Sequence, residues 1–116
     1  MIRVRVTGGR GSVRSIRISG HAYAGDPGED LICAAVSSIG IGTLNALEEL
    51  APETCKPELG DDIRISVRES TNTVQTILET MLVQLGTIAE KYPKNMKIDR
   101  TAAMKLKDAY SLEGKL

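Results

Sequence analysis

Three short stretches in which apolar and polar residues alternate constrain the fold more than any other feature of this chain. They are "IRVRV" at 2–6, "IRIS" at 16–19 and "DIRISVR" at 62–68, and a weaker fourth, "NMKIDR", follows at 95–100. Successive side chains of a strand point to opposite faces, so each stretch predicts a strand that is apolar on one face only. A sheet built from such strands needs cover on one side and can leave its other side in water.

Two helices are predicted between these strands. From 74 to 89 apolar residues recur with helical spacing, and Asn72 with Gln75 forms the cap pair expected at the start of this helix. The segment from Asp30 to about Leu50 is apolar on most sides, which indicates a helix buried against its neighbours.

The predicted element order is therefore ββαβαβ, which is typical of an α+β, two-layer sandwich. We expect a mixed four-stranded sheet with both helices packed on its apolar face. The chain has 116 residues, a length that fits one domain, and we place this domain at residues 1–100. Residues 101–116 are polar and are interpreted as a C-terminal tail with room for a short helix.

Composition and charge argue against several classes of protein. Hydrophobic residues at 41% and charged residues at 26% are values of globular chains. The 15 Lys and Arg residues balance 15 Asp and Glu residues, so net charge gives no argument for binding nucleic acid or a membrane. Two cysteines make no disulfide framework, and the N-terminus has no long apolar run typical of a signal peptide or anchor. We expect a cytoplasmic protein, and nothing in the sequence calls for a cofactor.

The stretch "SGHAYAGDPGEDLICAAVSS", residues 19–38, contains the only histidine of the chain, His21, and one of its two cysteines, Cys33. His21 comes just after the second predicted strand. Cys33 falls in the first turn of the first predicted helix, with Asp30 as its N-cap. Free backbone N–H groups at a helix start favour a thiolate, and a nearby imidazole activates a cysteine as a nucleophile. The stretch is therefore interpreted as an active site.

Other residues of this stretch fit the same interpretation. Gly20 and the later glycines of the loop allow close approach of a substrate. Asp30 is the candidate to orient the imidazole, and Ser37 lies one turn after Cys33, where its hydroxyl can line the site. Spacing alone does not show that His21 and Cys33 meet, because a loop histidine is commonly solvated and a cysteine on an apolar helix is commonly a buried hydrophobe.

The same stretch resembles the signature of the Prp family, the ribosomal-processing cysteine proteases of bacteria. Members read approximately G-H-A, a glycine-bearing loop, then G-x-D-[IVL]-[VI]-C-A-[AG]-x-S. This chain has "GHA" at 20–22 and "GEDLICAAVS" at 28–37, and the loop between them has the family's length. "DLIC" stands where many members have "DIVC", a mild departure, and the resemblance covers about residues 1–100.

The resemblance implies an endopeptidase that removes the short N-terminal extension of large-subunit ribosomal protein twenty-seven. It also implies a homodimer. Carried over by position, Cys33 is the nucleophile and His21 is the general base and acid. Asp30, Ser37 and Gly20 match supporting positions of the family.

Acyl transfer by this pair needs an oxyanion hole, and the backbone N–H groups of Ile32 and Cys33 are the candidates for it. The family's substrate has aromatic residues just before the cut. The resemblance therefore implies an apolar pocket beside the loop.

A binding module is the main rival interpretation. The polar positions of the strands carry basic residues that would form a surface for RNA if they shared one face: Arg3, Arg5, Arg17, Arg64, Arg68 and Lys97. No aromatic residue falls on those strand positions, so base stacking is missing. We favour a face that is solvated or that meets a partner subunit, and we expect no nucleic acid among the partners.

Metal and redox chemistry are weaker alternatives. Zinc held by His21, Cys33 and a loop carboxylate would lack a second histidine and paired cysteines, so we expect no metal. Cys55, in "PETCKP", is interpreted as an incidental thiol in a loop between two prolines. A redox pair of Cys33 and Cys55 stays open as an alternative.

Overall fold

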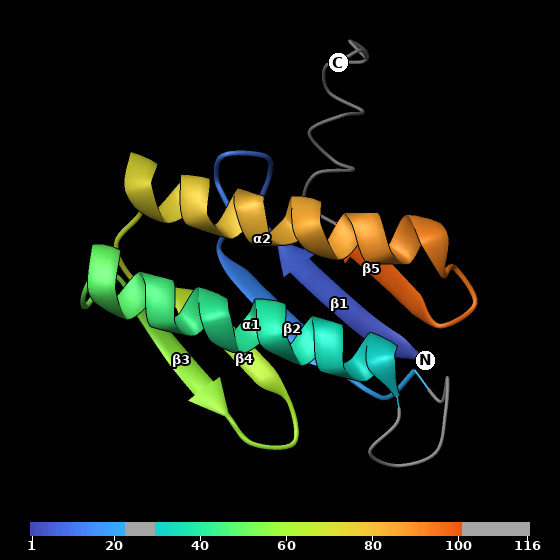
Figure 1. Cartoon of the computed structure of the whole chain (residues 1–116). Coiled ribbons are helices and arrows are strands. Elements are labelled where there is room, and N and C mark those ends of the chain that lie inside the picture. Colours follow the sequence, from blue (N-terminus) through green and yellow to red (C-terminus); the bar gives the residue numbers. More distant parts are fainter. Residues whose placement is uncertain (23–29, 101–116) are drawn as a thin grey trace, which may run out of the picture.

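The computed structural model describes residues 1–22 and 30–100. The chain folds into a five-stranded sheet with strand order β3-β4-β2-β1-β5 and two helices (Figure 1). β1 and β5 are parallel, and the other neighbouring strands are antiparallel. The elements are, in chain order, β1 (Ile2–Thr7), β2 (Ser15–Ser19), α1 (Leu31–Leu50), β3 (Cys55–Leu59), β4 (Ile63–Val67), α2 (Asn72–Lys91) and β5 (Met96–Arg100).

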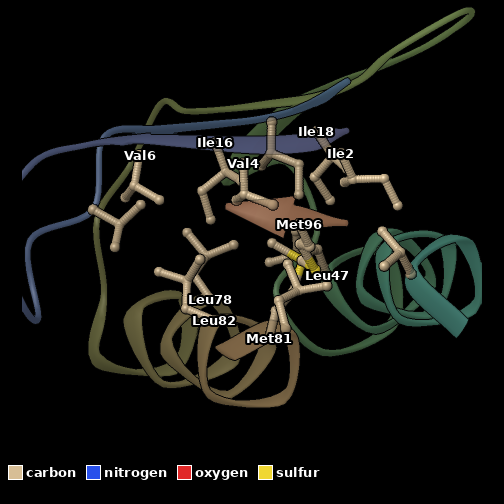
Figure 2. Packing of buried hydrophobic residues seen from close by; sticks show 14 of the residues in the cluster. Ile2, Val4, Val6, Ile16, Ile18, Leu47, Leu78, Met81, Leu82 and Met96 are labelled. Atoms are coloured by element: carbon tan, nitrogen blue, oxygen red, sulfur yellow. The ribbon is translucent and has the colours of Figure 1, made fainter. Parts of the chain in front are cut away.

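The two layers form because the strands are apolar on one face only. Along β1, buried and exposed residues alternate without exception, and both helices cover the buried face (Figure 1). Strand and helix side chains meet in one continuous core between the layers (Figure 2). The α+β sandwich with both helices on one face is thus confirmed. The largest fully buried side chains are those of Ile2, Ile16, Ile65, Leu78, Met81, Leu85 and Met96.

The sheet has one strand more than predicted, because β3 was taken for a loop. Pro57 lies in the middle of this strand and favours a loop when the sequence is read alone. β3 is an edge strand, paired only with β4, and an edge is where a sheet tolerates proline. The placement of Cys55 in a loop was therefore wrong, since Cys55 begins β3 opposite Val67.

The helix starts agree with the sequence to within one residue. Asp30 is the N-cap of α1, as predicted. The N-cap of α2 is Thr71 rather than Asn72, and the Thr71 hydroxyl accepts the Val74 N–H at 3.1 Å. Asn72 is therefore the first helical residue, because the hydroxyl of the preceding threonine performs the capping.

Gln75 is buried and joins α2 to the turn that leads into β2. Its side-chain oxygen accepts the Val13 N–H at 2.7 Å, and its side-chain nitrogen donates to the Val13 carbonyl at 3.0 Å. The same nitrogen donates to the Ser70 hydroxyl at 3.0 Å. One side chain thus satisfies both backbone groups of a buried residue far away in the sequence.

By length and composition alone, α1 is apolar enough to cross a membrane. In this structure its Ile32, Val36 and Leu47 are buried in the core beneath it. The expected burial of this helix thus holds for one face only, and Leu31, Ile41 and Leu50 on its other sides are exposed.

The substitution Gln75→Leu is expected to lower the free energy of unfolding by about 2–4 kcal/mol, because it leaves the buried Val13 N–H and carbonyl without partners. Urea denaturation followed by circular dichroism measures the loss. Gln84→Leu, at an exposed position of the same helix, is the control and should change stability by less than about 0.5 kcal/mol. Equal losses for both variants would contradict the role given to Gln75.

Candidate active site

His21 and Cys33 line the same cavity, which has a volume of 310 Å³. Gly20 and Ser37 line it as well, so the structure brings together four of the residues singled out in the sequence. His21 follows β2, whereas Cys33 and Ser37 lie one turn apart on α1. The cavity therefore forms where the end of β2 meets the start of α1.

Gly20 turns the chain between β2 and His21 in a way that only glycine permits. Its φ is +87°, a left-handed conformation that other residues rarely adopt. A Cβ atom at this position would lie 2.3 Å from the carbonyl oxygen of Met1. The backbone of Gly20 thus packs closely against that of Met1, just before β1. This packing fixes the direction in which the chain leaves β2 and the position of the His21 backbone.

The backbone around Cys33 is held by two hydrogen bonds. The Asp30 carboxylate accepts the Cys33 N–H at 3.0 Å, which caps α1. The Ala22 N–H donates to the Cys33 sulfur at 3.3 Å. Because Ala22 directly follows His21, this second bond ties the histidine segment to the cysteine.

Asn95 is a positioning residue that sequence reasoning missed. Its side-chain amide donates to the Ala22 carbonyl at 2.9 Å, and its own carbonyl accepts the Ile2 N–H at 2.8 Å. Asn95 precedes β5 and so connects β1 and β5 to the residue next to His21. No local signal marks it, because its partner lies at the far end of the chain's sequence.

Burial raises the pKa of the half-buried Cys33 thiol. The Ala22 N–H lowers this pKa, whereas the hydrogen bond and the negative charge of Asp30 raise it further. The pKa of Cys33 is thus shifted opposite to the direction expected from the helix start, mainly because burial disfavours the charged thiolate.

The cap has a second consequence for the predicted oxyanion hole. The Cys33 N–H is donated to Asp30 in this structure. Its use toward a substrate oxyanion, together with that of the Ile32 N–H, stays a prediction. The orientation of the His21 imidazole by Asp30 also stays a prediction.

The wall of the cavity that faces α1 comes from the β3–β4 hairpin. Leu59, Gly60, Asp61 and Ile63 supply it. Leu59 was missed in the sequence because its strand was not predicted, whereas Ile63 lies on the predicted strand at 62–68 but was not connected with the site. The signal was present as an alternation of apolar residues in "CKPEL" at 55–59.

The structure gives metal and redox chemistry no support in the part of the chain that it describes. Over residues 1–22 and 30–100, no three side chains of the metal-binding types gather at one place. Cys33 and Cys55 are both free, and they lie near opposite ends of α1. The loop residues 23–29 and the tail 101–116 lie outside the described residues.

The basic positions of the strands do share the uncovered face of the sheet. Arg5, Arg17 and Arg64 are direct neighbours on β1, β2 and β4. Asp62 pairs with two of them, at 2.7 Å from Arg17 and 3.5 Å from Arg64. Hydrogen bonds from these arginines, above all Arg17, lower the pKa of Asp62. Part of the positive charge of this face is thus neutralised within the protein. Lys97 likewise pairs with Asp99 on the same strand, β5.

Replacing Asp30 by Asn is expected to lower the pKa of Cys33, because the amide keeps the cap but removes the negative charge beside the sulfur. The rate of alkylation by iodoacetamide, measured against pH, should then rise at lower pH than in the wild type. Asp61→Asn, on the opposite wall of the cavity, is the control and should leave the profile in place. An unchanged profile in Asp30→Asn would refute the electrostatic role of this carboxylate.

Comparison with known proteins gives consistent matches. A family model described as cysteine protease Prp matches residues 1–97. The ribosomal processing cysteine protease Prp of Staphylococcus aureus (strain Mu50) is 36% identical over 107 residues, covering 85% of this chain and 98% of that protein. The protein of the same description from Bacillus subtilis (strain 168) is 30% identical over 94 residues, covering 74% and 84%.

Solved structures show the same fold. The S. aureus protease Prp in complex with a covalently linked product peptide superimposes with a TM-score of 0.80 at 33% identity, covering 86% of this chain and 99% of that one. The same protease in complex with a substrate peptide gives a TM-score of 0.75 at 32% identity, with the same coverage.

Proposed function

Because this chain belongs to the Prp family of cysteine proteases, we propose that it removes the N-terminal extension of large-subunit ribosomal protein twenty-seven. Cys33 is the nucleophile and His21 the general base and acid. The observation that carries the proposal is the shared cavity, which places the chain's only histidine and a half-buried cysteine at one solvent-accessible site. The S. aureus relative, solved with a covalently linked product peptide, supports a covalent intermediate here.

The first step combines proton transfer with nucleophilic attack. His21 takes the thiol proton of Cys33, whose pKa is raised by burial, as the sulfur attacks the scissile carbonyl carbon. When the C–N bond breaks, His21 returns that proton to the leaving amine, and a thioester remains on Cys33. His21 then takes a proton from water, the hydroxide attacks the thioester, and the thiol is restored as the acid product leaves.

The supporting residues act through position in this mechanism. Gly20 and Ala22 fix the backbone on either side of His21, and Ser37 lines the same cavity as Cys33. The Ile32 N–H supplies the first donor of the oxyanion hole, and the Cys33 N–H joins it when Asp30 releases it.

Two expectations from the family accompany this proposal. We expect a homodimer in solution and a location in the cytoplasm, where the ribosomal substrate is made. RNA binding by the uncovered sheet face is not proposed, since Asp62 already occupies two of its arginines.

The wild-type protein is expected to cut a peptide that spans the extension junction at one site. Cys33→Ala should abolish the cut, and His21→Ala should slow it by about 10²–10⁴-fold. Mass spectrometry of the products and the initial rates provide the measurement.

Cys55→Ala is the matched control, because it removes the other free thiol and should still cut the peptide at the same site. Cleavage that survives Cys33→Ala, or that is lost in Cys55→Ala, would overturn the assignment of the nucleophile.

A further inference from the structure

A second hollow, of 510 Å³, lies between the C-terminal half of α1 and the edge strand β3. The mechanism above does not use it. It is mainly apolar, and its apolar lining side chains include those of Leu44, Leu47, Ala51, Cys55, Pro57 and Leu59.

This hollow continues the cavity that contains Cys33. Leu59 lines both of them, at the end of β3 where the hairpin turns into β4. Ile41 lines the Cys33 cavity, and Leu44, three residues later on the same side of α1, lines the outer hollow. Leu59 is 62% exposed and Ile41 is 42% exposed, so large apolar side chains face water where the two spaces meet.

Together these spaces form what we name the α1–β3 groove. One wall is a single face of α1, and the other is the side of β3 that faces the helices, since every second residue of a strand shares a face. In Figure 1, β3 begins beside the C-terminal end of α1 and runs back toward its N-terminal end. The groove is defined by Ile41, Leu44 and Glu48 on α1 and by Cys55, Pro57 and Leu59 on β3.

Charge along the groove has one sign among the described residues. Glu48 and Glu53 line the outer hollow, and Asp61 lines the inner cavity. Neither space is lined by a lysine or an arginine of the described chain. The complementary occupant therefore combines apolar side chains with positive charge.

We propose that the α1–β3 groove binds an extended segment of the substrate peptide at a distance from the cut bond. From Cys33 to Leu44 and Leu47, α1 rises by about 16–21 Å. An extended peptide advances about 3.3 Å per residue, so the outer hollow receives the residue about five or six positions from the scissile bond. The groove selects an apolar or basic side chain there, and this proposal rests on the proposed protease function.

Cys55 allows this distance to be measured, because this residue lines the outer hollow. In the Cys33→Ala protein, peptides would each carry one cysteine, activated as a mixed disulfide with thionitrobenzoate, at positions two to eight on either side of the cut. Attack by the Cys55 thiolate forms a new S–S bond and releases thionitrobenzoate, which is coloured. Capture should peak at about the fifth or sixth position on one side of the cut. Capture at all positions alike, or at none, would overturn the proposal.

A charge reversal gives an independent test with a control on the same helix. Glu48 lines the groove, whereas its neighbour Glu49 is exposed and lines none of the hollows described here. Glu48→Lys should raise KM about three- to tenfold for a long basic peptide and leave a short peptide, cut off three residues from the scissile bond, unaffected. Glu49→Lys changes the net charge equally and should affect neither peptide.

The outcomes separate this proposal from the function on which it rests. If the wild type cuts the ribosomal peptide but neither capture nor the Glu48 effect is seen, the groove proposal fails alone. If the wild type cuts nothing while Cys55 is captured at the expected position, the groove binds peptide and the proposed substrate is wrong. Loss of a dimer in Glu48→Lys, seen by sedimentation, would show that a second copy occupies the groove and would overturn the proposal.

Discussion

Burial of one face of the sheet beneath α1 and α2 determines where every functional group of this protein lies. The apolar positions of β1, β2 and β4 are covered by α1 and α2 together, and this packing brings the first turn of α1 to the end of β2. Cys33 and His21 line one cavity there as a consequence of core packing. The hydrophobic core holds the backbone at this cavity together with the hydrogen bonds that Ala22, Asp30 and Asn95 make there.

Local patterns were enough to predict most of the fold. Strict alternation identified β1, β2 and β4, and helical spacing identified α2, because each of these elements buries one face against a single core. β3 was not predicted, because the proline in its centre favours a loop. The sheet tolerates this proline because β3 is an edge strand. Thr71 was overlooked as a cap because its neighbour Asn72 is an equally good capping residue by type.

The candidate site divides in the same way between local and distant contributions. His21, Cys33, Asp30 and Ser37 lie in one stretch of sequence, so they were identifiable together. The direction of the pKa shift of Cys33 could not be predicted from the sequence, because it depends on how deeply packing buries the sulfur. Asn95 and the hairpin wall at Leu59 were also out of reach, since their contacts join segments that are distant in sequence.

The parallel pairing of β1 with β5 has a consequence for the timing of synthesis. β1 is the first element made and β5 the last of the described fold, so the sheet is completed only when almost the whole domain has left the ribosome. Asn95, which holds Ala22 beside the cysteine, arrives with β5. A nascent chain therefore contains His21 and Cys33 long before it has the hydrogen bond from Asn95 that holds the backbone between them at Ala22.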